Sequence, residues 1–130
     1  MNHYFQEVLD VHILIGRWLG DPDSSSDVCD KLLARFSPDY SMVTTDGARL
    51  DYSSLVTFFR SQCGCRKGLE IEIENMQLIA ESTTGATVTY QERQKMPDQD
   101  ETIRFSTVVF ESGKDNQIMW RHLHETALPL

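Results

Sequence analysis

The sequence has few basic side chains, no long apolar run and an odd number of cysteines. Its 12 lysines and arginines stand against 20 aspartates and glutamates, which gives a formal net charge of -8. A surface of this charge repels a phosphate backbone or an anionic bilayer, so nucleic acid and membrane surfaces are excluded as partners. No stretch approaches the about 20 apolar residues of a membrane span, and the first residues do not resemble an export signal. We therefore expect a soluble, cytoplasmic protein.

Three cysteines, Cys29, Cys63 and Cys65, are too few and odd in number for a disulfide framework. The Cys63-Gly64-Cys65 spacing is shorter than the usual zinc spacing, and no second Cys/His pair completes a set of four ligands. We therefore expect free thiols in or beside a loop, and no bound metal at this pair.

The seven glycines include no Gly-x-Gly-x-x-Gly spacing, and no Gly-x-Ser-x-Gly motif is present. These patterns mark phosphate-cradling loops and the nucleophile of serine hydrolases, so neither a nucleotide cofactor nor a serine triad is predicted. We expect no cofactor. The length of 130 residues suits a single domain that covers residues 1–130.

The first half of the chain has helical spacing of apolar residues. Residues 3–19 carry an apolar stripe that includes Phe5, Val8 and Ile15, and residues 27–35 form a second, shorter amphipathic segment. A strand is predicted over 39–45, ending at the Asp46-Gly47 turn, and Asp51 is the expected N-cap of a third helix.

From Leu69 onward the apolar period changes to two, which predicts strands. Leu69, Ile71 and Ile73 alternate with glutamates, and turn sequences separate further strands over 86–95, 101–111 and 116–126. Four strands joined by short turns form an antiparallel meander. Helices followed by strands predict an α+β fold with the helices on one face of a bent sheet. Because apolar residues also lie on the opposite face, we expect a homodimer through the sheet.

The most informative polar residues lie on the last three predicted strands. The expected turns place Glu92 opposite Arg104 and Tyr90 opposite Ser106, and place Ser106 near His122 and Arg104 near His124. One face would then carry Tyr90, Glu92, Arg104, Ser106, Trp120, His122 and His124. In one interpretation Arg104 binds a carboxylate ligand in a pocket beside the histidines. In the other, Glu92 and Arg104 form a structural ion pair and Trp120 belongs to the core.

Histidines offer two further hypotheses. His12 lies on the apolar stripe of the first helix, where a hydrogen-bonded core histidine is favoured over a catalytic one. His122 and His124 face one way but lack a third ligand, since Glu125 would face the other side, so no metal site is predicted.

Several short sequence segments are typical of one protein family. They are Trp18-Leu19-Gly20, the run from Phe36 to Val43 with Asp46-Gly47, Tyr90-Gln91-Glu92, Arg104-Phe105-Ser106 and the run from Trp120 to Glu125. With the order of elements, they resemble the SnoaL-like members of the nuclear transport factor 2-like superfamily over nearly the whole chain. The resemblance implies a cone in which a strongly curved antiparallel sheet wraps around a long N-terminal helix, with two further short helices and a pocket at the open end.

The same resemblance bears on activity. In the related ketosteroid isomerase, an aspartate base precedes a glycine by three residues, and the equivalent position here is Thr44. The missing carboxylate favours a noncatalytic dimeric module that binds a small, acidic molecule, with His12 and the strand cluster as pocket candidates. The alternative is a cofactor-free lyase or isomerase in which His122 or His12 is the base and Arg104 or Tyr90 stabilises an enolate-like oxygen.

Overall fold

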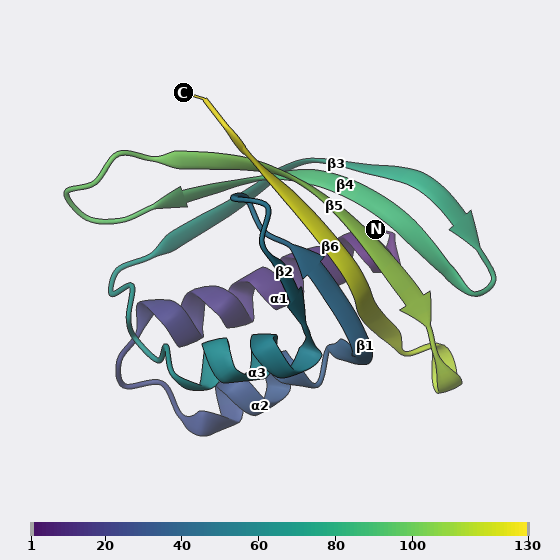
Figure 1. Cartoon of the computed structure of the whole chain (residues 1–130), viewed down its shortest axis with the longest axis horizontal. Coiled ribbons are helices and arrows are strands. Elements are labelled where there is room, and N and C mark those ends of the chain that lie inside the picture. Colours follow the sequence, from purple (N-terminus) through teal and green to yellow (C-terminus); the bar gives the residue numbers. More distant parts are fainter. Residues whose placement is uncertain (1, 130) are drawn as a thin grey trace.

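The computed structural model describes residues 2–129, and in this part of the chain three α-helices lie under one six-stranded sheet. In chain order the elements are α1 (His3–Gly20), α2 (Ser26–Leu33), β1 (Phe36–Val43), β2 (Arg49–Asp51), α3 (Tyr52–Arg60), β3 (Glu70–Ser82), β4 (Gly85–Lys95), β5 (Thr102–Ser112), the single 3-10 turn η1 (Lys114–Asn116) and β6 (Ile118–Leu128). The curved sheet arches over the helices (Figure 1). The predicted α+β cone is confirmed.

Helix positions follow the sequence signals closely. α1 buries one stripe that includes Val8, Val11 and Trp18, and the Asn2 side chain caps its first turn by accepting from the Tyr4 amide at 2.7 Å. Asp51 caps α3 as expected, accepting from the Ser54 amide at 2.8 Å. The second helix begins and ends one to two residues earlier than predicted.

The sheet has the strand order β2-β1-β6-β5-β4-β3. Strands β3 to β6 form the predicted antiparallel meander, but β1 runs parallel to β6, which makes the sheet mixed rather than wholly antiparallel. The three-residue strand β2 pairs with β1 and was not predicted, because so short a segment shows no alternation.

Strand β1 begins at Phe36, three residues before the predicted start. Phe36 pairs with Trp120 of β6, and the Trp120 amide donates to the Arg35 carbonyl at 2.9 Å. Pro38 lies within the strand where the pairing with β6 is irregular, between Phe36 and Ser41. A residue without an N–H is tolerated at such a point.

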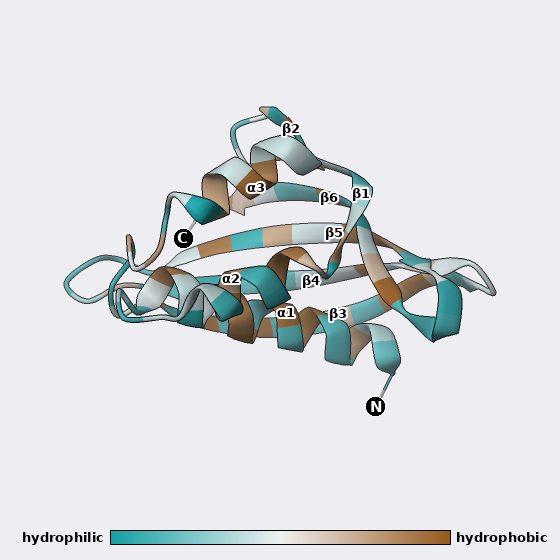
Figure 2. Ribbon diagram, turned by 90° about the horizontal axis from the view of Figure 1, so that it is seen from below, coloured by the Kyte–Doolittle hydropathy of each residue, from teal (hydrophilic) through white to brown (hydrophobic). Residues whose placement is uncertain are grey.

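The core lies between α1 and the inner face of the sheet. Val88, Val108, Phe110 and Trp120 are almost fully buried there, opposite the apolar stripe of α1. Seen from the helix side, apolar segments recur along α1, α3 and the strands behind them (Figure 2). Among residues 2–129, no helix is both long and apolar enough to cross a membrane.

Candidate ligand-binding cavity

A cavity of about 270 Å³ lies between α1, α3 and the inner face of the sheet. This volume is just below the usual range of about 300–1,000 Å³ for small-molecule sites, so it suits a small ligand. The walls are mainly apolar and include Val11, Ile15, Met42, Leu55 and Phe59. The polar groups of the lining are His12, Tyr40, Thr44, Thr45, Arg66, Glu92, Gln94, Arg104 and Glu125.

Strands β4 and β5 supply the polar end. Glu92 and Gln94 are two residues apart on β4, so both point to the inner face, where both are buried. Glu92 pairs with Arg104 and Tyr90 pairs with Ser106 across β4 and β5, which confirms the predicted register of these two strands. The Glu92–Arg104 juxtaposition therefore exists, although the closest partner of each side chain is a different residue.

The partner of Glu92 is His12 on α1. The His12 ring is 6% exposed, its Nδ1 lies 2.7 Å from the Val8 carbonyl and its Nε2 lies 3.1 Å from Oε1 of Glu92. Since both neighbours are acceptors, both ring nitrogens donate and the ring is an imidazolium. Burial opposes the charged ring, but the attraction of Glu92 and the hydrogen bonds raise the pKa of His12 overall. Burial opposes charged Glu92 too, yet His12, Arg104 and Gln94 lower its pKa to about 2.

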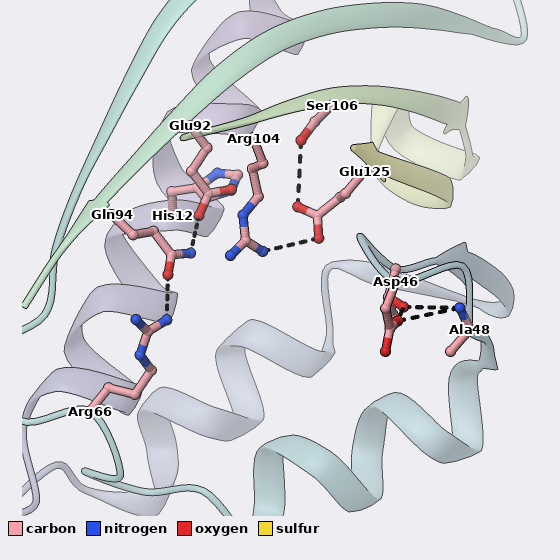
Figure 3. A network of polar contacts seen from close by, with 10 residues as sticks. His12, Asp46, Ala48, Arg66, Glu92, Gln94, Arg104, Ser106 and Glu125 are labelled. Carbon is pink, nitrogen blue, oxygen red and sulfur yellow. Dashed lines mark hydrogen bonds and ion pairs between the residues drawn. The ribbon is translucent and has the colours of Figure 1, made fainter. Parts of the chain in front are cut away.

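Gln94 extends this network toward Arg66, in the loop after α3. Its Nε2 donates to Glu92 Oε2 at 2.6 Å, and its Oε1 accepts from the Arg66 guanidinium (Figure 3). The loop is held against the end of α1, because the amides of Gly64 and Arg66 donate to the carbonyls of Trp18 and Leu19, both at 2.9 Å. Gly64 has a φ of +64°, and a Cβ there would collide with the backbone of Pro22.

A second, looser set of polar groups lies beside the first. Glu125 of β6 is 6% exposed and accepts from the Arg104 guanidinium at 3.2 Å and from the Ser106 hydroxyl at 3.4 Å (Figure 3). Both distances are at the long end for a charged pair. Burial is the main cause that raises the pKa of Glu125, with Glu92 adding to it and Arg104 opposing it. Arg104 keeps 26% of its side chain exposed.

Tyr90 lies behind this set without a hydrogen-bond partner. Its side chain is fully buried and its hydroxyl makes no hydrogen bond of good geometry in the described part of the chain. The Tyr90 ring contacts the edge of the His12 ring at a centroid distance of 5.4 Å. Burial raises the pKa of Tyr90 well above its ordinary value, so the hydroxyl remains protonated.

The predicted register of β5 and β6 is wrong: the connection between the two strands is longer than expected, and β6 also contains a bulge. Phe110 pairs with Trp120, but the next residue back on β5, Val109, pairs with His122, so Arg121 is an extra residue. A bulge of this kind shifts all later side chains to the opposite face. Ser106 faces Glu125 rather than His122, and Arg104 pairs with Ala127 rather than lying near His124. The bulge accounts for one residue of this displacement and thereby decides which face each side chain takes.

His122 and His124 therefore lie outside the cavity, in contrast to the predicted cluster. They pair with Val109 and Thr107 on the outward face of the sheet. Nδ1 of His122 lies 2.7 Å from the Ser41 hydroxyl. Partial burial, with the charges of His124 and Arg121, lowers the pKa of His122. No group of three potential metal ligands forms within residues 2–129.

Trp120 lies on the inner face as predicted and belongs to the aromatic core beside the cavity. Its ring contacts those of Phe110 and Phe36 at centroid distances of 5.0 and 5.7 Å. Its indole N–H donates to Glu7 at 3.2 Å, and Glu7 also accepts from Arg35 at 2.7 Å. The indole is thus fixed by packing and by a buried carboxylate.

At the open end, Thr44 lines the cavity where ketosteroid isomerase would have its base. Asp46 is an exposed turn former: its carboxylate accepts from the Thr44 hydroxyl and from the Ala48 amide, the latter at 3.4 Å (Figure 3). These hydrogen bonds lower the pKa of Asp46. It does not line the cavity.

Sequence reasoning missed Tyr40, Arg66, Gln94 and Glu125. Gln94 follows Tyr90 and Glu92 at the strand period of two, so the same alternation could have placed it on the inner face. Glu125 was assigned to the other face because the bulge was not recognised. Arg66 comes from a loop, for which no periodicity exists.

Comparison with known proteins agrees with this geometry. The model of the SnoaL-like domain family matches residues 23–127. A nuclear transport factor 2-like protein of unknown function from Pseudomonas aeruginosa is 41% identical, with 97% of this chain and 98% of that chain covered and a TM-score of 0.91. No curated protein matches the chain.

More distant solved structures share the fold alone. A nuclear transport factor 2-like protein from Cytophaga hutchinsonii is 13% identical, with 98% of this chain and 100% of that chain covered and a TM-score of 0.70. The CamKII hub homology domain of Chlamydomonas reinhardtii is 12% identical, with 97% and 96% covered and a TM-score of 0.75. By its family match, its fold and its 41% identical relative, the chain belongs to the SnoaL-like family of the nuclear transport factor 2-like superfamily.

Proposed function

We propose that residues 1–130 form one domain that binds a small organic acid in the cavity without transforming it. The observation that carries the proposal is the position of Arg104. Its guanidinium lines a mainly apolar cavity, keeps 26% of its side chain exposed and has a single charged partner at 3.2 Å among the described residues. A guanidinium has five N–H donors in a planar fork that matches a carboxylate, so most of this capacity is free for a ligand.

The charges of the lining favour an anion. Three cationic groups, His12, Arg66 and Arg104, line the cavity, against the two carboxylates Glu92 and Glu125. This set carries one more positive than negative charge, which favours an anionic over a cationic ligand. A cation would add to an existing excess in a cavity with apolar walls, where charges are weakly screened.

The apolar walls define the rest of the ligand. Ile15, Leu55 and Phe59 surround the space away from the arginines, and burying ligand carbon against them yields about 25 cal/mol per Å². The ligand class is therefore a compact aromatic or aliphatic carboxylate with no second charge.

A thermal-shift comparison tests this function. Benzoate, phenylacetate and 1-naphthoate are compared with the corresponding neutral amides, and the acids are expected to stabilise the protein. A ligand at 100 times its Kd adds about 2.7 kcal/mol to the free energy of unfolding. The gain should vanish in Arg104→Ala and persist in Arg93→Ala, because Arg93 pairs with Glu74 and Glu101 on the outward face. Equal shifts with acids and amides, or no shift with any acid, would refute the proposal.

The geometry supports binding over the alternative of a histidine base. Both ring nitrogens of His12 donate to fixed acceptors and its pKa is raised, so the ring has no lone pair to accept a proton. His122 lies on the outward face. The two carboxylates of the lining, Glu92 and Glu125, accept hydrogen bonds from His12 and Gln94 and from Arg104 and Ser106 respectively.

We also propose a homodimer through the outward face of β5 and β6. This face carries Ile103, Phe105, Thr107, Val109, His122, His124, Thr126 and Leu128. Phe105 is 40% exposed at its centre, which is unusual for a large aromatic side chain in a monomer.

Sedimentation equilibrium tests the dimer. We expect twice the mass of one chain, and half that value for Phe105→Asp, because a carboxylate would have to be buried. The matched control is Ile13→Asp, which changes a residue of 53% exposure on α1 and should leave the mass unchanged. A wild-type protein that sediments as a monomer would overturn the proposal.

A cytoplasmic location is proposed on the state of the cysteines. Cys29 is buried, Cys63 and Cys65 are exposed, and all three are free thiols. Exposed free thiols suit a reducing compartment. Fractionation of cells that express the chain tests this location, and recovery outside the cytoplasm would contradict it.

A further inference from the structure

Glu125 occupies the place on Arg104 that a ligand carboxylate would take. Its carboxylate is on the wall of the same cavity, 3.2 Å from the Arg104 guanidinium and 6% exposed. Its one other hydrogen bond among the described residues comes from the neutral Ser106 hydroxyl at 3.4 Å. Within residues 2–129 each of Glu92 and Glu125 has one ion pair, but Glu92 also accepts a short hydrogen bond of 2.6 Å from Gln94.

The groups that face Glu125 come from four elements. They are Arg104 and Ser106 on β5, Tyr90 and Glu92 on β4, His12 on α1 and Tyr40 on β1. His12 is committed to Glu92, and the tyrosine hydroxyls are neutral. Arg104 is thus the cation on which the charge of Glu125 depends.

We propose, building on the function proposed above, that Glu125 selects for anionic ligands by exchange. The ligand carboxylate replaces Glu125 on Arg104, and the displaced Glu125 takes up one proton from solvent. The overall step is free protein plus ligand anion plus one proton to complex. No bond other than the new O–H forms, and the net charge of the cavity is unchanged by binding.

Electrostatics explains why the proton accompanies the ligand. Two carboxylates that share one arginine at close range repel each other, and one of them is protonated in consequence. The ligand carboxylate makes the closer contact with the guanidinium, while Glu125 sits in an apolar environment that already disfavours its charge. In agreement with this geometry, burial raises the pKa of Glu125 even in the free protein, where Arg104 opposes the rise.

The other charged groups of the cavity do not account for such a proton. Glu92, with a pKa of about 2, stays ionised at neutral pH because His12 and Gln94 hold its two oxygens. His12 is already protonated, and its raised pKa keeps it so. His122 and His124 lie on the outward face of the sheet.

Titration calorimetry with 1-naphthoate counts the protons. The acid is ionised throughout pH 6–8, and the heat measured in phosphate and in Tris differs by the number of protons exchanged with the buffer. We expect an uptake that approaches one proton per ligand, and an affinity that falls by up to tenfold for each unit of pH.

Variants assign the proton to Glu125. Glu125→Gln should bind with no proton uptake and with an affinity independent of pH, because its amide does not titrate. Glu111→Gln, which alters an exposed carboxylate paired with Arg121, should keep the wild-type uptake. Uptake that survives in Glu125→Gln would overturn the proposal.

Proton uptake by the wild-type protein tests the exchange even if Glu125→Gln does not fold. Binding of 1-naphthoate with no proton uptake would refute the exchange and leave the proposed binding function intact. No binding of 1-naphthoate, benzoate or phenylacetate would refute both. The two failures are therefore distinguishable.

Discussion

The two carboxylates of the cavity, Glu92 and Glu125, have similar burial and opposite environments. Glu92 is 3% exposed, accepts from His12 at 3.1 Å and from Gln94 at 2.6 Å, and faces Arg104 across the strand pair. Glu125 is 6% exposed and has only the longer contacts with Arg104 and Ser106. Burial penalises both charges, but only Glu92 has enough partners to offset that cost, so their pKa values shift in opposite directions.

The difference in partners suggests a structural role for Glu92 and a ligand-binding role for the Arg104–Glu125 pair. A buried charge with every oxygen satisfied fixes one arrangement of α1 against β4, because moving either partner leaves an unpaired charge in the core. Glu125 has one cation and one neutral hydroxyl as partners, so a second anion can compete with it for that cation. The His12–Glu92 pair therefore fixes α1 against β4, and the Arg104–Glu125 pair is where we propose that a ligand binds.

The largest effect on stability is expected from removing His12, the main partner of buried Glu92. His12→Ala removes the imidazolium and leaves Glu92 buried without its main partner, which should lower the free energy of unfolding by about 3–5 kcal/mol. Urea denaturation followed by circular dichroism measures this loss. His12→Leu combined with Glu92→Leu should lose less than His12→Ala alone, because no unpaired charge remains.

A loss below about 1 kcal/mol in His12→Ala would contradict the comparison, since surface-like pairs contribute no more than that. In that case Glu92 would be as weakly held as Glu125. The two ends of the cavity would then not differ in the way the contacts indicate.

A smaller effect is expected from acid. The pKa of Glu92 falls from 4.5 in the unfolded chain to about 2, so its ionised form contributes stability above pH 4.5 that is lost as the pH falls through 2. A change of this size corresponds to about 3 kcal/mol. Unfolding free energies of wild type and Glu92→Gln should therefore converge between pH 4.5 and pH 2.

Other buried carboxylates do not produce this convergence. The pKa of Glu7 and that of Glu125 are raised, mainly by burial, so their contributions change with pH in the opposite direction. A constant difference between wild type and Glu92→Gln across the acid range would show that Glu92 is not held in its charged form.

The sequence predicted the β4–β5 side of the cavity and missed the β6 side, because a bulge decides which β6 side chains face inward. The turn between β4 and β5 is short, so alternation correctly placed Tyr90, Glu92, Arg104 and Ser106 on the inner face. The bulge at Arg121 broke the alternation on β6 and moved two histidines outward. Only the structure reveals the bulge: Trp120 and Leu123 are both buried, yet residues three apart cannot share one face of a regular strand.

Other features had no local signal. The parallel pairing of β1 with β6 joins segments separated by most of the chain, and it depends on how the sheet curves rather than on any pattern within either strand. His12 was correctly favoured as a hydrogen-bonded core residue. Its acceptor, Glu92, lies 80 positions away, so tertiary packing alone brings the two together.

The smallest effect on stability is expected at Glu125, where the dependence of stability on pH has the opposite sign to that at Glu92. Its pKa is raised in the folded chain, so the folded state binds more protons than the unfolded state between 4.5 and that raised pKa, and stability falls as pH rises through this window. Glu125→Gln removes this dependence, because the amide keeps the shape without the charge. At neutral pH the variant should be as stable as wild type or more stable, whereas Glu92→Gln should be about 3 kcal/mol less stable. Thermal unfolding of both variants at pH 7 checks the contrast, since loss of stability in both would mean that Arg104 holds Glu125 as firmly as His12 holds Glu92.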